Sequence, residues 1–216
     1  LSRSSSKARN SNSAKSTTAL FDGAGDYQIQ VTARDSGNLT AASVVRLRVL
    51  QTATGLVVSP TITTLPVGST QAFTATLLDQ FGFISASPPP TFTWETSGGG
   101  TISEAGIFTA VSAGGPYLVT ASQGAVSNTA SVAVTPGTAS ILLGNLSQIY
   151  DGTPKPATAT TTPENLPVPI TANGRSTPPT NAGTYIIVAT VTDANHQGSA
   201  SGTLVIEKAT VTITLA

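Results

Sequence analysis

A glycine, one further residue and a tyrosine occur together three times in this chain, each time at the start of a stretch of alternating apolar residues. The copies are Gly25-Asp26-Tyr27, Gly115-Pro116-Tyr117 and Gly183-Thr184-Tyr185. A second alternating stretch follows each copy, at residues 45–49, 130–134 and 203–206. Alternation with a period of two predicts strands that are buried on one face. The chain is therefore predicted to contain consecutive β modules, each of which closes with the same pair of strands.

The tyrosine follows a turn and begins the penultimate strand, which resembles the tyrosine corner of immunoglobulin-like sandwiches. The resemblance implies that the ring packs at the edge of the core while the hydroxyl binds a nearby backbone group. Threonine, valine, 20 glycines and 14 prolines suit short strands and turns, whereas helix-forming residues are scarce. We expect an all-β fold made of tandem immunoglobulin-like β-sandwiches.

Charge and cysteine usage exclude several classes of protein. Ten basic and ten acidic residues give zero net charge, which argues against a nucleic-acid partner because such proteins need a concentrated basic face. Four basic residues near the start could form an arm that binds nucleic acid or a membrane. We favour the interpretation that they lie in a solvated polar segment. These residues are Arg3, Lys7, Arg9 and Lys15. The absence of cysteine excludes disulfides and thiolate metal sites and favours a bacterial exported protein.

No apolar run reaches the roughly 18 residues of a membrane-spanning helix, so no membrane insertion is expected. The chain opens without a signal peptide, and its start at Leu1 is interpreted as a cut through a longer protein.

Residues 1–50 are expected to form only the C-terminal part of a module, without the front strands of a sandwich. The sequence predicts a weak strand at 17–21, a turn at 22–25 and a hairpin turn at Asp35-Ser36-Gly37-Asn38. Aspartate favours an Asx turn there, and Gly-Asn tolerates positive φ. This segment resembles the C-terminal half of PKD- or cadherin-like modules.

Residues 54–135 are expected to form a complete module. Its first strand, 56–67, is broken by Pro60, and Phe73, Ala75 and Leu77 share one face of a strand at 71–77. Trp94 is expected in the core, residues 88–90 as a stiff triple proline and residues 98–100 as a triple-glycine hairpin. Five stretches resemble the bacterial Ig-like (Big) domains of the intimin and invasin type: 65–75, 79–82, 93–94, 106–110 and 130–132.

Residues 138–208 resemble a second family, the mostly bacterial Ig-like (MBG) domains. The resemblance rests on Tyr150-Asp151-Gly152-Thr153-Pro154 and on Asn181-Ala182-Gly183-Thr184-Tyr185, while His196 stands where a tyrosine is usual. The stretch at 138–143 is echoed at 208–213, so residues 209–216 are expected to begin a further copy.

Residues with catalytic or metal-binding chemistry do not form a complete constellation in the sequence. His196 has no second histidine and no cysteine as a partner, and we expect it on an exposed loop. The set Asp22, Asp26, Asp35 and Asn38 could bind calcium, but each residue suits a turn. Glu95 and Glu104 could pair as acid and base, but we expect both to face solvent.

Three short motifs also lack the context that their chemistry requires. The triple glycine at 98–100 lacks the Gly-Lys-Ser/Thr ending of a phosphate loop, and residues 198–202 carry alanine where a nucleophile elbow needs serine. Residues Ser4 to Lys7 match the Ser-x-x-Lys pattern in residue type, but they lack the structural context that this motif requires. The sequence therefore predicts no catalytic, cofactor-binding or metal-binding residue.

The aromatic residues and the possible glycosylation sites have structural explanations as well. Trp94, Tyr117 and Tyr185 are interpreted as core residues, and Tyr150 is the aromatic residue expected to be most exposed. Asn38 and Asn145 begin glycosylation sequons that a bacterial protein is expected to leave unused.

Together these patterns favour a non-enzymatic stalk or adhesive repeat of a bacterial surface or secreted protein. Its partners are expected to be the neighbouring modules, because the linkers at 51–53 and 136–138 are short and restrict bending. The alternative is a carbohydrate- or receptor-binding accessory module of a secreted enzyme or adhesin. Residues 195–197 or the loop at 81–90 would then make the contact.

Overall fold

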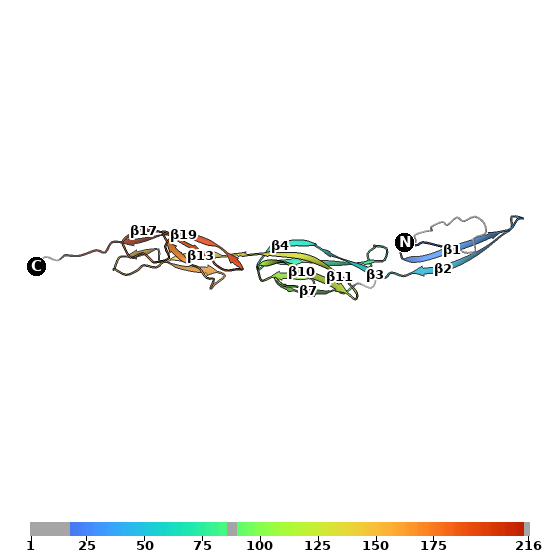
Figure 1. Cartoon of the computed structure of the whole chain (residues 1–216), viewed down its shortest axis with the longest axis horizontal. Helices are drawn as coiled ribbons and strands as arrows, with labels where there is room; N and C mark the ends of the chain where they lie inside the picture. Colours follow the sequence, from blue (N-terminus) through green and yellow to red (C-terminus); the bar gives the residue numbers. More distant parts are fainter. Residues whose placement is uncertain (1–17, 86–89, 214–216) are drawn as a thin grey trace. The chain divides into compact units, whose positions relative to one another are not determined.

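The computed structural model describes residues 18–85 and 90–213, and all its regular elements are β-strands (Figure 1). The strands are β1 (Gly25–Arg34), β2 (Thr40–Val49), β3 (Ala53–Ser59), β4 (Ile62–Pro66), β5 (Thr70–Ala72), β6 (Thr74–Asp79), β7 (Thr93–Thr96), β8 (Gly100–Ile102), β9 (Ile107–Ala110), β10 (Gly114–Gln123), β11 (Val126–Thr135), β12 (Gly137–Thr138), β13 (Ser140–Gly144), β14 (Ser147–Ile149), β15 (Thr158–Thr162), β16 (Ile170–Ala172), β17 (Gly183–Thr190), β18 (His196–Gln197) and β19 (Ser199–Glu207). The expected all-β fold is confirmed.

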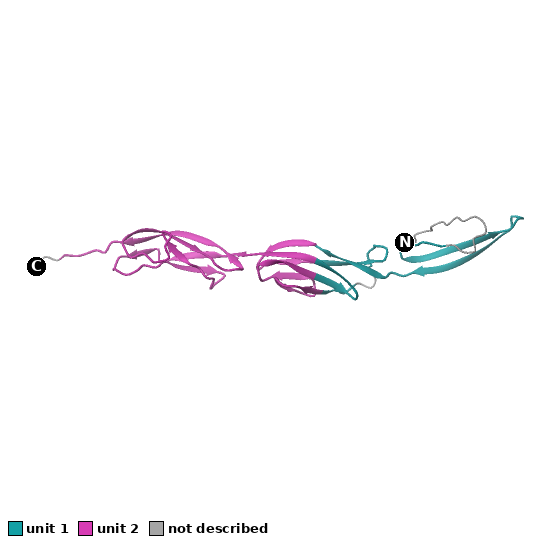
Figure 2. Cartoon of the chain, viewed as in Figure 1, with its two compact units in different colours: residues 1–59, 74–93, 120–129 teal, residues 60–73, 94–119, 130–216 magenta. Residues whose placement is uncertain are grey.

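The chain divides into two compact units, which Figure 2 colours separately. Residues 1–59, 74–93 and 120–129 form the first unit, and residues 60–73, 94–119 and 130–216 form the second. The pairs β1–β2 and β3–β6 belong to the first unit. The three-stranded sheet β5-β9-β8 and every strand from β12 onwards belong to the second, while β10 and β11 contribute residues to both.

Strands β1 and β2 form an antiparallel hairpin in which Gly25 faces Val49 and Arg34 faces Thr40. The predicted turn is confirmed, because the Asp35 carboxylate accepts a hydrogen bond of 2.8 Å from the Leu39 N–H and Asn38 has a φ of 68°. The weak strand expected at 17–21 is wrong for residues 18–21, which form no strand, and Thr17 lies outside the described residues. Within the described part of the chain, β1 and β2 pair only with each other.

Strands β3 to β11 form the middle sandwich. Its first strand is broken at Pro60, as predicted, and the two parts lie in different sheets. β3 pairs antiparallel with β6, whereas β4 pairs parallel with β11 in the sheet β4-β11-β10-β7. The strand expected at 71–77 is interrupted at Phe73. β5 before it pairs with β9, whereas β6 after it pairs with β3. The Phe73 N–H donates to the Gly106 carbonyl oxygen at 2.8 Å, and its side chain is buried.

Strands β13 to β19 form the C-terminal sandwich, which repeats the same arrangement. β13 pairs antiparallel with β15, and β14 pairs parallel with β19 in the sheet β14-β19-β17-β16. Asn145, with a φ of 58°, lies where the first strand passes from one sheet to the other. Strands that switch sheets at a bend are a regular device of β-sandwiches.

Each sandwich has its own apolar core. In the middle sandwich the largest fully buried side chains include Phe73, Phe108, Val119 and Val132, and the half-buried Trp94 ring lies 6.5 Å from that of Phe73. In the C-terminal sandwich the core consists of Ala172, Ile187, Leu204 and Ile206. Burial of a large apolar side chain stabilises the fold by about 1.5–3 kcal/mol.

The triple glycine at 98–100 is not the hairpin that the sequence suggests. It joins β7 to β8, which belong to different sheets. A Cβ atom at Gly99 would lie 2.3 Å from the Tyr117 ring, and one at Gly100 would lie 2.0 Å from the Thr109 carbonyl oxygen. Glycine is required because the chain crosses between the sheets directly against the tyrosine ring.

Replacement of Gly99 by alanine is expected to destabilise the middle sandwich more than the same change at Gly68. Both residues have similar positive φ, 73° and 86°, but nothing lies within 4 Å of a Cβ at Gly68. The left-handed backbone costs about 1–2 kcal/mol at either site, and overpacking against Tyr117 adds about 1–3 kcal/mol at Gly99. Chemical denaturation of Gly99→Ala and Gly68→Ala measures the difference, and equal losses would contradict the close approach.

Candidate functional site

The three repeated tyrosines make the same local contact. Their hydroxyl groups donate to the carbonyl oxygen four residues upstream, Tyr27 to Gly23 at 2.7 Å, Tyr117 to Ala113 at 3.5 Å and Tyr185 to Asn181 at 2.9 Å. All three rings are half-buried. The preceding glycines Gly25, Gly115 and Gly183 all have positive φ, which glycine adopts without strain. The expected tyrosine corner is confirmed, and its role is structural.

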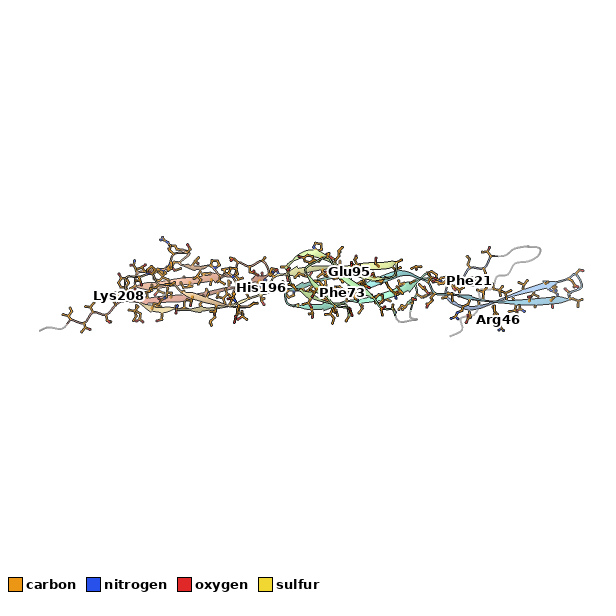
Figure 3. All side chains as sticks on the ribbon, turned by 90° about the horizontal axis from the view of Figure 1, so that it is seen from below. Phe21, Arg46, Phe73, Glu95, His196 and Lys208 are labelled. Carbon is orange, nitrogen blue, oxygen red and sulfur yellow. The ribbon has the colours of Figure 1, made fainter. Side chains whose placement is uncertain are left out.

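The carboxylates considered as an acid–base pair remain in solvent. Glu95 (labelled in Figure 3) and Glu104 are both exposed, as the sequence predicts. Residues 199–202 lie within β19 rather than in the sharp turn of a nucleophile elbow. The Ser4–Lys7 motif lies outside the described residues.

The possible calcium ligands of the N-terminal segment are not brought together. Asp26 lies near the start of β1, 3.7 Å from Arg48, whereas Asp35 lies beyond its far end. Strand geometry separates these two positions by about 30 Å. Across residues 18–85 and 90–213, no three His, Asp or Glu side chains are close enough together to hold a metal ion.

Polar side chains gather instead beside the linker that joins β2 to β3. The buried Asp79 carboxylate accepts hydrogen bonds from the Phe81 and Phe83 N–H groups, both at 2.9 Å, and from the Gln51 side-chain amide at 3.2 Å. Burial acts to raise the pKa of Asp79, but these three hydrogen bonds outweigh it and lower the pKa.

Gln80 holds the same linker from the next position. Its side-chain amide donates to the Leu50 carbonyl oxygen at 2.6 Å and accepts from the Thr52 N–H at 2.7 Å. Asp79 and Gln80 together therefore bind three consecutive linker residues, of which two are bound through the backbone.

His196 was expected to be an exposed loop residue, and this prediction is wrong. It lies in β18 (Figure 3), its side chain is 21% exposed, and β18 pairs parallel with β12 of the second linker. His196 Nδ1 is 2.8 Å from the Asp193 carboxylate. This hydrogen bond, together with that from the Asn195 N–H, outweighs burial and keeps the pKa of Asp193 below its usual value.

Asn195 is half-buried and binds groups on both sides of the second linker. Its side-chain oxygen accepts a hydrogen bond of 2.8 Å from the Ala113 N–H, and its carbonyl oxygen accepts one of 2.8 Å from the Gly137 N–H. The Gln197 carbonyl oxygen accepts another from the Ala139 N–H at 2.8 Å. Residues 195–197, considered as a possible external contact, thus engage groups of their own chain.

Among the described residues, a surface hollow and an exposed apolar pair could contact an external ligand. A hollow of about 100 Å³ in the C-terminal sandwich is walled by prolines and has Arg175 among its lining residues. On the loop after β6, Phe83 and Ile84 are 52% and 64% exposed, while residues 86–89 of that loop lie outside the described residues. Tyr150 is 39% exposed, less than Phe83, so the prediction that it is the most exposed aromatic residue is wrong.

The linker residues Gln51, Gln80 and Asn195 were missed as a group by sequence reasoning. Sequence reasoning placed Gln51 in a linker, Gln80 in the stretch 79–82 and Asn195 among possible external contacts, but it predicted none of the hydrogen bonds that they make. The signal that could have found them is their place in the chain, because each lies in a short linker or in a turn beside one.

Comparison with known proteins finds a family match for one part of the chain. The MBG domain family model matches residues 139–210, which confirms the resemblance noted for residues 138–208. Among curated proteins, none matches this chain. Within the described residues, no helix has the length and apolar character needed to span a bilayer.

Solved structures of immunoglobulin domains and of a surface-layer protein are similar to this chain at low identity. The N-terminal four Ig domains of Dscam1 isoform 8.4 share 17% identity over 83% of this chain and 54% of that chain, with a TM-score of 0.39. The S-layer protein rSbsC(31-844) shares 15% identity over 87% of this chain and 35% of that one, with a TM-score of 0.36. The chain thus spans about half or less of their lengths, and its fold is assigned from its own strand pairing.

The tyrosine corners should differ in strength. Tyr185→Phe removes a hydrogen bond of 2.9 Å, so we expect the free energy of unfolding to fall by about 0.5–1.5 kcal/mol. Tyr117→Phe is the matched control, because its contact of 3.5 Å is at the limit of a hydrogen bond and should contribute less. Urea denaturation measures the free energy of unfolding of both variants. A larger loss for Tyr117→Phe than for Tyr185→Phe would refute the assignment.

Acidification should weaken the hydrogen bonds of Asp79 that hold the first linker. The folded pKa of Asp79 is lowered, so its contribution to stability is complete above about pH 5 and is lost as the pH falls below about 4. Melting temperatures between pH 7 and pH 2 should therefore stay level and then fall. Asp79→Asn should make the acid-dependent fall shallower, and an unchanged profile in this variant would contradict the role of the carboxylate.

Proposed function

We propose that this chain is a non-enzymatic spacer of tandem immunoglobulin-like modules in a bacterial cell-surface or secreted protein. The modules are the C-terminal part of a PKD- or cadherin-like module at 1–50, a Big-type domain at 54–135 and an MBG-type domain at 138–208. Residues 209–216 begin a further repeat. The partners of each module are its neighbours in the same chain.

The proposal depends above all on the length and the hydrogen bonding of the linkers. β2 ends at Val49 and β3 begins at Ala53, while β11 ends at Thr135 and β12 begins at Gly137. Three residues and one residue therefore separate the strands of consecutive modules. Side chains of the following module bind the first linker, and backbone carbonyl oxygens of the following module bind the second. Short, bound linkers restrict bending, which is what a spacer needs.

The polar groups with lowered pKa values support the same conclusion. Asp79 accepts backbone N–H groups of its own turn and the Gln51 side-chain amide of the first linker, and Asp193 binds His196 and the Asn195 N–H of its own turn. Asp151 is held by Lys155 at 2.6 Å and by the Thr153 hydroxyl and N–H, which lowers its pKa within a surface turn. Each shift is explained by a turn or a linker contact rather than by catalytic work.

A carbohydrate- or receptor-binding module is the second candidate, favoured by the exposed Phe83 and Ile84. Neighbouring exposed apolar side chains mark interaction sites when they form a patch. Binding through this loop would make the chain an adhesive module rather than a spacer alone.

Two measurements on the 216-residue chain separate these functions. We expect no saturable binding on glycan arrays or on cell surfaces. Under force, the middle sandwich should unfold as a separate event with a gain in contour length of about 25–30 nm. Saturable binding that Phe83→Ser abolishes without a change in melting temperature would refute the spacer proposal and establish the second candidate.

A further inference from the structure

Asn195 connects groups that lie on the two sides of the second linker. Its side-chain oxygen binds the Ala113 N–H, between β9 and β10 of the middle sandwich, and its carbonyl oxygen binds the linker at Gly137. Ala113 and Asn195 are 82 residues apart in sequence. One residue of the C-terminal sandwich thus holds both the linker and the module that precedes it.

The direction of the Asn195 side chain is fixed by its own loop. The Asn195 N–H donates to the Asp193 carboxylate at 2.9 Å, and the same oxygen is 2.8 Å from His196 Nδ1. Asp193 therefore forms an Asx turn that sets the backbone of Asn195, and His196 holds Asp193 in place. The amide oxygen is left to point at Ala113.

The linker itself leaves little room to move. A Cβ atom at Gly137 would lie 3.0 Å from the Val67 carbonyl oxygen and 3.6 Å from the His196 ring. The linker backbone thus passes between a residue of the middle sandwich and one of the C-terminal sandwich. The preceding Pro136 has a φ fixed by its ring, which removes one rotation of the backbone.

We propose that Asn195 is a latch that joins the C-terminal sandwich to the middle sandwich, with Asp193 and His196 as its positioning residues. The group that it recognises is the backbone N–H of Ala113. The inference deepens the proposed spacer function and rests on it, because a latch of this kind matters where the angle between modules must be held. Loss of the side-chain acceptor should free the two sandwiches to swing about Pro136.

Distance measurement between two spin labels tests the latch directly. The chain has no cysteine, so Thr101→Cys and Thr203→Cys give two unique labelling sites, both exposed, on β8 and β19. We expect one narrow distance distribution for the parent chain. In Asn195→Ala, the ratio of molecules inside that narrow population to molecules outside it should fall by about two- to tenfold, as expected for the loss of one net hydrogen bond.

Two further variants separate the hydrogen bond from a general loss of structure. Asn195→Asp keeps an acceptor oxygen and should retain most of the narrow population. Asn128→Ala removes a side-chain hydrogen bond of 2.6 Å to Leu56 within the middle sandwich and should leave the distribution unchanged. Thermal melting of every variant verifies that both sandwiches remain folded.

The outcomes distinguish the latch from the spacer proposal. A distribution in Asn195→Ala as narrow as that of the parent chain would overturn the latch alone, and so would an Asn195→Asp variant as broad as Asn195→Ala. A broad distribution in the parent chain would overturn the latch and also count against a spacer with bound linkers. Saturable ligand binding, measured separately, would overturn the spacer and leave the latch standing.

Discussion

The hydrogen bond from a tyrosine hydroxyl to the carbonyl oxygen four residues upstream determines how each module closes. A hydroxyl at the edge of an apolar core must find an acceptor, because an unpaired polar group there is costly. The acceptor is the carbonyl oxygen two residues before the glycine of each motif. The turn, the ring and the first residues of the strand are thus positioned together, and the final strand can pair with a neighbour of defined register.

The two linkers use the same physical solution with different residues. In each, an aspartate accepts backbone N–H groups of its own turn, and a nearby amide side chain reaches a backbone group at or across the linker. Asp79 and Gln80 do this at the first linker, and Asp193 and Asn195 do it at the second. A carboxylate that accepts several N–H groups is held rigidly, so it fixes the turn that carries the neighbouring amide side chain.

Much of the fold followed from the sequence, because the deciding interactions lie within a few residues. The alternating stretches, the Asp35 turn and the tyrosine corners each span at most a strand or a turn. The wrong predictions share the opposite property. The triple glycine looked like a hairpin because its neighbours were strands, but the sheets to which β7 and β8 belong are chosen by distant partners. His196 looked exposed because its pairing partner, β12, lies almost sixty residues earlier.

By itself, the sequence determined that this protein is built from β modules, where their closing strands begin and which residues form their turns. These properties depend on side-chain periodicity and on hydrogen bonds between near neighbours, which a local pattern specifies. Only the tertiary structure decided what Gly99, Asp79, Gln80 and Asn195 do. Each contacts a residue distant in sequence across a sheet or a linker. The nearest of these distant partners is Tyr117, 18 residues from Gly99, and the farthest is Ala113, 82 residues from Asn195. Nothing in a short stretch of sequence distinguishes an amide that reaches such a partner from one that faces water.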